Sequence, residues 1–286
     1  MKILVTGKNG QLGRSMQEKA QGIDDLEFIF IDQEEMDMTE LPAVKRKIRS
    51  LQPDILVNCA GYTAVDHAED EPQLADRLNS EVVGLLASLS SELGFLLIHI
   101  STDYVFDGKN HRPYEEDDPF NAPSVYGQSK IKGEEGIMSA AERAVILRTS
   151  WLYSVYGKNF MKTMLRLGKE KDELGVVFDQ VGTPTYAGDL SDAIMTIIAK
   201  QESIEGIRIY HYSNEGAISW YDFAKAIMEL SGLNCQIKPV QSHEFPSKAP
   251  RPFYSVLNKS RIKEELHLEI PYWKDSLNRC LKKQGN

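Results

Sequence analysis

The stretch Ile3-Leu4-Val5-Thr6-Gly7-Lys8-Asn9-Gly10-Gln11-Leu12-Gly13 decides how this chain folds. Its first three residues form a continuous apolar run, which is typical of a buried parallel strand. The glycines at positions 7, 10 and 13 follow, and helix-forming residues continue to Ala20. Glycine suits such a turn because a Cβ would block the close approach of a phosphate. Strand, glycine turn and helix place backbone N–H groups and the positive end of a helix against a pyrophosphate, so a dinucleotide-binding turn is predicted.

Strands and helices continue to alternate along the first half of the chain. This alternation predicts an α/β fold with a Rossmann-type, doubly wound parallel sheet and right-handed crossovers. A long helix is expected over residues 71–93, and another from Asn159 to Gly168, where the glycine would stop it. Ser219 to Asp222 resembles a capping box, and Gly232 would close the helix that it opens. Further strands are expected at residues 27–31, 53–58, 95–100, 144–147, 176–178 and 207–212.

The predicted strand ends carry the candidate nucleotide-binding residues. Ligands of doubly wound sheets bind beyond the C-terminal strand ends, and Gly7, Asp32, Gly61 and Thr102 all fall there. Asp32 lies nineteen positions after Gly13, close to the ~20 expected for an acid that hydrogen-bonds a ribose 2′-hydroxyl. A carboxylate at this place repels a 2′-phosphate, so NADH is slightly favoured over NADPH. The small residues around Gly61 suit an adenine or ribose that lies close to the backbone.

Tyr126 and Lys130 are the candidate catalytic pair. They stand at i and i+4, so on a helix their side chains rise from one face. A neighbouring ammonium would draw the pKa of a phenol down from ~10 towards neutrality. Thr102, at a strand end, would hydrogen-bond a substrate carbonyl, Tyr126 would deliver the proton, and Lys130 would hold the nicotinamide ribose. Each residue alone has an ordinary structural explanation, but the set on this scaffold indicates an active site.

Composition narrows the class of protein. The 286-residue chain has a net charge of −9 and no basic block, which argues against nucleic acid, because phosphate binding needs clustered Lys and Arg. No apolar run approaches the ~20 residues of a membrane span. The three cysteines are far apart and fit thiols in a reducing cytoplasm. The six histidines lack the spacing of metal ligands, so no zinc site built by the protein is expected.

Taken together, these motifs resemble the extended short-chain dehydrogenase/reductases and, more narrowly, the dTDP-4-dehydrorhamnose reductase family. The glycine turn, the Thr102 strand end and the Tyr-x-x-x-Lys pair carry the broader resemblance. The narrower one covers nearly the whole chain. It rests on Gly10-Gln11-Leu12-Gly13, Asn58-Cys-Ala-Gly-Tyr-Thr-Ala-Val-Asp66, Ser101-Thr-Asp-Tyr-Val-Phe106, Val125-Tyr-Gly127, Arg148-Thr-Ser-Trp151 and Arg251-Pro252.

The resemblance implies NAD(P)H-dependent reduction of dTDP-4-dehydro-β-L-rhamnose to dTDP-β-L-rhamnose. Tyr126 would donate the proton and Lys130 would anchor the cofactor. Thr102 and Asp103 would contact the sugar, with Trp151 stacked against it. The residues expected to bind the cofactor are Gly7, Gly10, Gln11, Leu12, Asp32, Asp37, Met38, Ala60, Gly61, Tyr62, Thr63, Tyr126 and Lys130.

A smaller α/β substrate domain is expected to complete the protein. Residues 1–151, with returning segments at about 174–214, would form the NAD(P)-binding domain. About 152–173 and 215–286 would form the substrate domain. Its proline-rich loop carries Arg251, whose bidentate fork could pair with a diphosphate, although such a loop could also be a solvated linker.

Two alternative functions stay open from the sequence. A nucleotide-sugar epimerase uses the same scaffold but returns its cofactor oxidised. A non-catalytic regulatory subunit, resembling the beta subunit of methionine adenosyltransferase, uses the fold without the chemistry. Some members of the family are described as metal-bridged dimers that use glutamates. Ser15 and Gly188 stand at two of those positions here, so we expect a monomer or a homodimer without a metal bridge.

Overall fold

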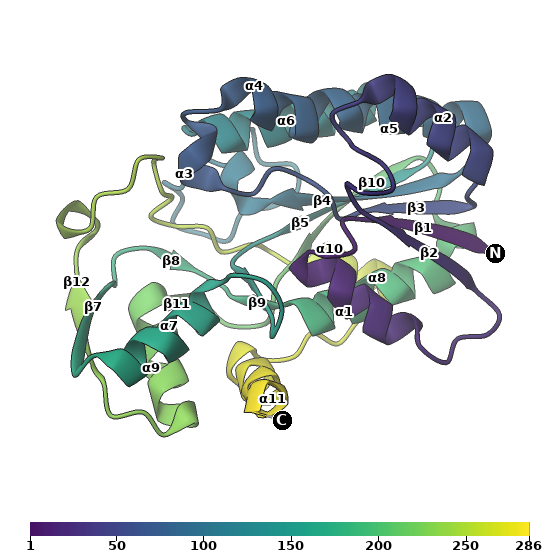
Figure 1. The fold of residues 1–286 in the computed structure, drawn as a ribbon. Helices are drawn as coiled ribbons and strands as arrows, with labels where there is room; N and C mark the ends of the chain where they lie inside the picture. Colours follow the sequence, from purple (N-terminus) through teal and green to yellow (C-terminus); the bar gives the residue numbers. More distant parts are fainter. Residues whose placement is uncertain (286) are drawn as a thin grey trace.

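In a computed structural model, which describes residues 1–285, a six-stranded parallel sheet forms the centre of the protein (Figure 1). Its order is β10-β5-β4-β3-β1-β2, and every neighbouring pair is parallel. The chain therefore leaves β1 in one direction to form β2 and in the other to form β3, which creates a topological switch point between β1 and β3. The predicted Rossmann-type fold is confirmed. The strands are β1 (Lys2–Thr6), β2 (Glu27–Ile31), β3 (Ile55–Asn58), β4 (Leu96–Thr102), β5 (Ala144–Thr149) and β10 (Ile207–Tyr212).

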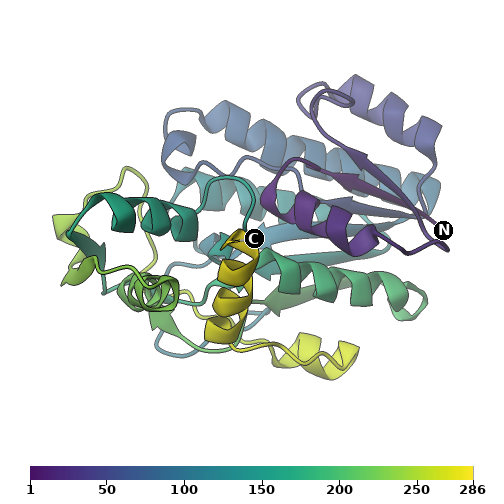
Figure 2. The same ribbon diagram turned by 60° about the horizontal axis from the view of Figure 1, so that its bottom comes forward.

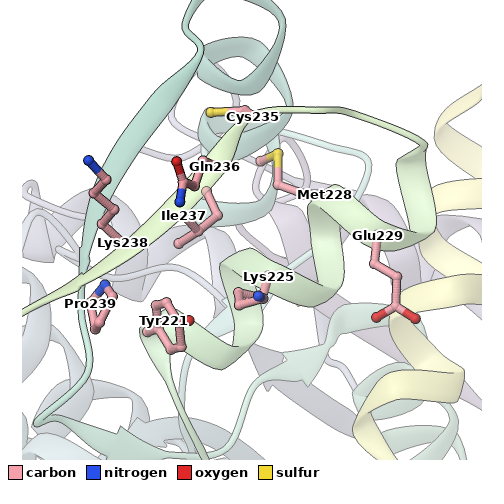
Figure 3. A pocket seen from close by; sticks show the side chains of 9 residues that line it. All are labelled: Tyr221, Lys225, Met228, Glu229, Cys235, Gln236, Ile237, Lys238 and Pro239. Carbon is pink, nitrogen blue, oxygen red and sulfur yellow. The ribbon is translucent and has the colours of Figure 1, made fainter.

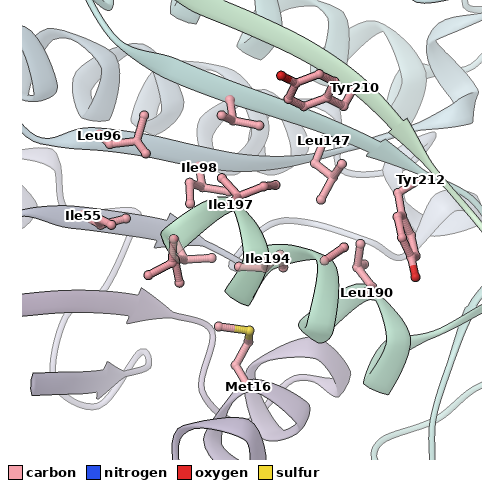
Figure 4. Close-up of a cluster of buried hydrophobic side chains, with 14 of the residues drawn as sticks. Met16, Ile55, Leu96, Ile98, Leu147, Leu190, Ile194, Ile197, Tyr210 and Tyr212 are labelled. Atoms are coloured by element: carbon pink, nitrogen blue, oxygen red, sulfur yellow. The ribbon is translucent and has the colours of Figure 1, made fainter. Parts of the chain in front are cut away.

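Helices cover both faces of this sheet (Figures 1 and 2). The four inner strands, β1, β3, β4 and β5, are buried on both sides, which explains their near-continuous Ile, Leu and Val content. Figure 4 shows one of the two cores, where Met16, Ile194 and Ile197 pack against Ile98 and Leu147 of the sheet. One layer contains α1 (Gln11–Ala20), α8 (Ala187–Ala199) and α10 (Ser260–Leu266), and the other contains α2 (Leu41–Leu51), α5 (Val82–Leu93) and α6 (Val125–Ala140).

A small lobe with its own apolar core lies beside the sheet (Figure 1). It contains α7 (Phe160–Glu170), α9 (Trp220–Ser231), α11 (Trp273–Gly285), β7 (Glu173–Val177) and β12 (Gln236–Val240). β7 pairs with β12 rather than with the large sheet, although its residues fall within the returning segment at about 174–214. The predicted domain boundaries themselves stay a prediction. Two short pairs join the lobe to the sheet, β6 (Leu152–Tyr153) with β9 (Thr185–Tyr186) and β8 (Val181–Gly182) with β11 (Ile218–Ser219).

The predicted capping box at α9 is confirmed. Ser219 accepts from the backbone N–H of Asp222, while the Asp222 carboxylate accepts from the backbone N–H of Ser219. Gly232 follows the helix in the left-handed region at φ 64°, as a glycine stop requires.

The prediction of a single helix over residues 71–93 is wrong in detail, because the segment is divided into three parts. Pro72–Asp76 forms α4, Arg77–Glu81 forms a π-helical turn, η1, and α5 follows. The wider turn directs the Asn79 side chain inward, where it bonds to the Tyr62 backbone and to Ser129 of α6. The pattern of apolar residues gave no sign of this turn, because it is held by an inward polar contact. The remaining short elements are α3 (Val65–Ala68) and the 3₁₀ turns η2 (Asp103–Val105), η3 (Gln201–Ser203) and η4 (Ser242–Glu244).

Gly168 does not stop α7, which continues to Glu170. A Cβ at Gly168 would lie 2.6 Å from the sulfur of Met228, so this glycine allows α7 and α9 to pack closely. The prediction was wrong because a glycine that serves helix packing and a glycine that ends a helix look alike in sequence.

Candidate functional site

A cleft of about 810 Å³ opens at the C-terminal ends of the parallel strands. It lies at the switch point between β1 and β3, where doubly wound sheets bind ligands. The sequence-predicted residues that line it are Gly7, Gly10, Gln11, Leu12, Asp32, Asp37, Met38, Ala60, Gly61, Thr63, Thr102, Asp103, Tyr126, Lys130 and Trp151.

A second pocket, of about 620 Å³, lies in the small lobe between α9 and β12 (Figure 3). Its polar groups include Lys225, Glu229 and Lys238. Lys238 pairs with Glu173 and Lys225 lies over the ring of Tyr221, so these charges already have partners at the surface. The cleft at the strand ends is therefore the candidate site.

The glycine turn has the shape of a phosphate cradle. A Cβ at Gly13 would lie 2.1 Å from the carbonyl oxygen of Gly7, and one at Gly7 would lie 2.9 Å from the backbone nitrogen of Ala60. Gly7 also has φ +70°, which favours glycine. Gly10 precedes α1 in extended conformation, and no side chain caps the first turn of this helix. The open helix N-terminus beside a turn without side chains fits a pyrophosphate.

Asp32 lies at the edge of this cradle. Its carboxylate accepts from the backbone N–H groups of Asn9 and Gln33, each at 2.8 Å. Lys8, the nearest cation in the glycine turn, is paired with Glu35. Asp32 thus brings a negative charge to the part of the cleft where the sequence places the adenosine ribose.

The proposed catalytic side chains meet at the start of α6. Ser124 caps this helix by accepting from the backbone N–H of Gly127 at 3.1 Å, which fixes the turn that carries Tyr126. Tyr126 is buried against Tyr104, with ring centroids 5.5 Å apart in an edge-on arrangement. Thr102 ends β4, and both Thr102 and Tyr126 line the cleft.

The expected effect of Lys130 on Tyr126 is wrong in this structure. Burial raises the pKa of Tyr126 above its ordinary value, and the hydrogen bond with Thr102 only partly opposes this. Lys130 directs its Nζ to the carbonyl oxygen of Ile100 at 2.7 Å and lies 3.3 Å from Nε2 of His99. The sequence could not show that the phenol is buried. A phenol with a raised pKa keeps its proton at neutral pH, as a proton donor must.

Lys130 itself has an altered proton affinity. It is 5% exposed, and burial lowers its pKa to about 8, while the charge of Glu134 acts in the opposite direction. Glu134 is paired in turn with Arg148, which donates to both of its carboxylate oxygens. Lys130 therefore titrates much closer to neutral pH than an exposed lysine.

Asp103 brings an unsatisfied buried oxygen to the substrate side. Its Oδ1 accepts from the Thr102 hydroxyl at 3.1 Å, whereas its Oδ2 is buried and has no hydrogen bond of ordinary geometry among residues 1–285, although the Ser255 hydroxyl lies near enough to lower the pKa of the carboxyl. Burial raises the pKa of Asp103 to about 6. A buried acceptor without a partner carries a free-energy penalty that a hydroxyl-rich ligand would remove.

Trp151 lines the cleft and is packed against a residue of the small lobe. It has φ 47°, rare for a bulky residue, and its ring stacks on that of Trp220 with centroids 3.5 Å apart and planes at 11°. Gly182 leaves room for it, because a Cβ there would lie 2.8 Å from the indole ring. One face of Trp151 is thus covered by Trp220.

Two of the sequence-predicted residues do not line the cleft. Tyr62 donates its hydroxyl hydrogen to Glu71 at 2.6 Å. Arg251 binds Asp66 and donates to the Tyr104 hydroxyl at 3.0 Å. Lys248 of the same loop is paired with Asp70. These two ion pairs join the proline-rich loop to α3 and to the turn that follows it.

The structure also adds residues that the sequence did not single out. Ser150 and Lys158 line the cleft; Ser150 stands inside the Arg148–Trp151 motif but had no role assigned to it, and Lys158 belongs to no motif. Asp66 is the partner of Arg251, a pairing across 185 positions that spacing could not indicate. The loop over residues 104–123 is tied to the sheet by Arg148, which donates to the carbonyl oxygen of Glu116 at 2.9 Å.

The residues considered for a metal bridge have ordinary surroundings. The Ser15 hydroxyl donates to the carbonyl oxygen of Gln11, and Gly188 packs beside the ring of Tyr186. Over the described part of the chain, no group of three or more His, Cys, Asp and Glu side chains could hold a metal ion. In the same range no helix is both long enough and apolar enough to cross a membrane.

Comparison with known proteins places the chain among nucleotide-sugar enzymes. A family model described as the RmlD substrate binding domain matches residues 1–285. The chain is 42% identical over 287 residues to the spore coat polysaccharide biosynthesis protein SpsK of Bacillus subtilis (strain 168), covering 100% of this chain and 98% of that protein. It is 42% identical over 288 residues to a dTDP-4-dehydrorhamnose reductase of Sinorhizobium fredii, covering 98% and 97%.

A solved structure agrees with these relatives. The dTDP-4-dehydrorhamnose reductase of Bacillus anthracis, in complex with NADP, superposes with a TM-score of 0.94 and is 37% identical, covering 99% of each chain.

Proposed function

The chain belongs to the RmlD substrate binding domain family, that of the dTDP-4-dehydrorhamnose reductases, and we propose that it reduces dTDP-4-dehydro-β-L-rhamnose to dTDP-β-L-rhamnose with a reduced nicotinamide cofactor. One observation carries the proposal. A buried, protonated Tyr126 lines the same cleft as a phosphate cradle and an unsatisfied sugar-side carboxylate, Asp103. These are the groups that a carbonyl reductase acting on a nucleotide sugar needs.

The cofactor half of the cleft would hold NADH or NADPH, which supplies a hydride to the C4 carbonyl carbon. The glycine turn and the open N-terminus of α1 would bind the pyrophosphate. Lys130 would donate to the nicotinamide ribose. We propose that NADH is preferred, because the carboxylate of Asp32 faces the expected ribose and would repel a 2′-phosphate.

Thr102 and Tyr126 would act on the substrate oxygen. The Thr102 hydroxyl, which donates to Asp103 Oδ1 in the protein without ligand, would turn its hydrogen to the C4 carbonyl oxygen and hold that oxygen beside Tyr126. As negative charge develops on that oxygen, Tyr126 would pass its hydroxyl proton to it, which gives the C4 hydroxyl. General acid catalysis of this kind contributes about 10²–10⁴-fold to the rate.

The sugar and its diphosphate would occupy the half of the cleft next to the small lobe. Asp103 Oδ2 would accept a sugar hydroxyl, which would satisfy its buried oxygen. The open part of the Trp151 ring would pack against the sugar. Arg251 would reach the diphosphate by exchanging Asp66 for a phosphate. In this scheme about 152–173 and 215–286 serve the substrate, and residues 1–151 with returning segments at about 174–214 serve the cofactor.

The test is an assay of the purified protein with dTDP-4-dehydro-β-L-rhamnose and NADH, following the nicotinamide absorbance and the sugar by mass spectrometry. We expect one equivalent of NADH to be oxidised for each sugar that gains two hydrogens. Tyr126→Phe should lower turnover by about 100-fold or more with cofactor binding kept, because the variant lacks only the hydroxyl group that donates the proton. A sugar returned as an epimer with no net NADH oxidation would overturn the proposal.

A further inference from the structure

The loop between β6 and α7, residues 154–159, is folded around one side chain of α1. The amide oxygen of Gln11 accepts from Nδ2 of Asn159 at 2.8 Å and lies 3.1 Å from the hydroxyl oxygen of Ser154. Its amide nitrogen donates to the carbonyl oxygen of Leu152 at 3.3 Å. Both ends of the amide are thus bound to the protein. The Gln11 side chain is therefore used to hold the loop, although Gln11 also lines the cleft.

Two further features fix the same loop beside α1. The Tyr156 hydroxyl donates to the carboxylate of Glu18, about two turns after Gln11 on this helix. Gly157 has φ +61°, and a Cβ there would lie 3.3 Å from Cγ of Gln11. The glycine therefore lets the loop turn closely over the first residue of α1. This is the end of the helix that is open to a phosphate.

Lys158 follows Gly157 in this loop and lines the cleft. Of the lining residues that the structure describes, Lys130 and Lys158 are the two with a basic side chain, whereas three carry a carboxylate, namely Asp32, Asp37 and Asp103. Lys130 is buried, and its Nζ donates to the backbone. Lys158 is exposed and takes part in no ion pair within residues 1–285. Its charge is thus available to an anion that enters the cleft.

We propose that Lys158 donates to the pyrophosphate of the bound cofactor, and that Gln11 is the positioning residue that holds Lys158 there through the loop over residues 154–159. The glycine cradle supplies backbone N–H groups, and Lys158 adds a full positive charge beside them. The inference rests on the proposed function in taking the ligand of this half of the cleft to be a nicotinamide dinucleotide. NADH and NADPH share the pyrophosphate, so Lys158 strengthens the binding of both.

The test measures binding to variants of Lys158 by isothermal titration calorimetry. The probes are NADH and ADP-ribose, which share the pyrophosphate, and dTDP, which represents the diphosphate of the substrate. We expect Lys158→Met to raise the dissociation constants of NADH and ADP-ribose by about five- to tenfold and to make both less dependent on salt, because one charge that faces a phosphate is lost. The dissociation constant of dTDP should not change.

Two matched variants serve as controls. Lys158→Arg keeps the charge and should bind NADH as the wild type does. Lys169 is an exposed lysine in the last turn of α7, outside the cleft, so Lys169→Met removes an equal charge at a distance from the proposed contact. It should also leave NADH affinity unchanged.

Gln11→Met tests the positioning role, because it keeps the length of the side chain and removes its hydrogen bonds. We expect it to raise the dissociation constant of NADH by a similar factor in the wild-type background and to change it little in a Lys158→Met background. A merely structural role of Gln11 would weaken NADH binding equally in both backgrounds.

Three results would overturn the proposal. They are unchanged NADH affinity in Lys158→Met, weaker binding of NADH without weaker binding of ADP-ribose, and equal effects of Gln11→Met in the two backgrounds. A wild-type protein that binds neither dinucleotide would overturn the proposed function as well.

These measurements use no keto sugar, so they separate the inference from the proposed reaction. A protein that fails to reduce the keto sugar but binds NADH and ADP-ribose less tightly in Lys158→Met would contradict the reaction and support the role of Lys158. An active reductase whose Lys158→Met variant binds NADH as the wild type does would do the reverse.

Discussion

The cofactor half and the substrate half of the cleft are built in different ways. The cofactor half consists of backbone at the ends of adjacent parallel strands, and its shape follows from the sheet and three glycines. The substrate half consists of side chains held by distant partners, and in the cleft Trp151 stacks on Trp220 of the small lobe. Arg251, which is proposed to reach the substrate but does not line the cleft in this structure, is held by Asp66.

The cofactor half is therefore expected to be rigid, whereas the substrate half can adjust to its ligand. Backbone at strand ends cannot move without disturbing the sheet, so the cofactor half is preformed. The contacts of the substrate half are ion pairs and stacked rings, which can exchange partners when a ligand arrives. We therefore expect a substitution in one half of the cleft to leave the affinity for the ligand of the other half nearly unaltered.

The largest expected effect on ligand binding comes from filling the glycine cradle. Gly13→Ala would place a Cβ 2.1 Å from the Gly7 carbonyl oxygen, so the turn must shift away from the pyrophosphate. We expect the dissociation constant of NADH, measured by fluorescence titration, to rise about 100-fold. Gly84→Ala, where a Cβ meets no atom within 4 Å, is the matched control. Unchanged NADH affinity in Gly13→Ala would show that the cradle does not bind the cofactor.

The next effect concerns the stability of the substrate half. The pKa of Asp103 is about 6 in the folded protein, above the ordinary value of 3.8. Between these values the folded state binds more protons than the unfolded state, so the free energy of unfolding falls as pH rises from about 4 to about 6. The full loss at pH 7 is roughly 3 kcal/mol.

Denaturant unfolding at a series of pH values measures this loss. Asp103→Asn should remove the fall, making the variant more stable than the wild type at pH 7 while raising its KM for the sugar. A pH profile identical to that of the wild type would mean that Asp103 is not a strained buried acid.

A smaller effect is expected from the stacked tryptophans. Trp220→Ala removes the support of Trp151, whose left-handed backbone leaves it dependent on that contact. We expect the KM for the nucleotide sugar to rise about tenfold, the equivalent of about 1.4 kcal/mol, with NADH affinity unchanged. Trp220→Phe should restore most of the affinity. If NADH affinity fell equally, the two halves would not be independent.

The smallest effect is expected from weakening the ion pair between Arg251 and Asp66. Asp66→Asn weakens the ion pair that holds Arg251 away from a diphosphate. We expect the KM for the nucleotide sugar to fall two- to threefold, about 0.5 kcal/mol, and the difference to shrink at high salt, because partly exposed ion pairs are screened. Steady-state kinetics at two salt concentrations measure it. A raised KM would show that Asp66 positions Arg251 for the substrate instead of competing with it.

The same difference explains what the sequence could and could not predict. The glycine turn, Asp32 and the Tyr126–Lys130 spacing are local patterns whose geometry is fixed by a strand or a helix, and the structure brings them to one cleft. The partners of Trp151 and Arg251 lie far along the chain and depend on tertiary packing. The direction of the Tyr126 pKa was mistaken for the same reason, since burial is a property of the fold. The π-helical turn at Arg77–Glu81 likewise depends on contacts of Asn79.

The proposed hydride transfer from NADH to C4 of the sugar is tested most directly with deuterium. The purified protein is given dTDP-4-dehydro-β-L-rhamnose and NADH carrying deuterium at the transferable position, and the product is analysed by NMR. We expect one deuterium at C4 of the sugar for each NADH oxidised. Oxidation of NADH without deuterium in the sugar, or recovery of an epimerised keto sugar with the NADH unchanged, would contradict it.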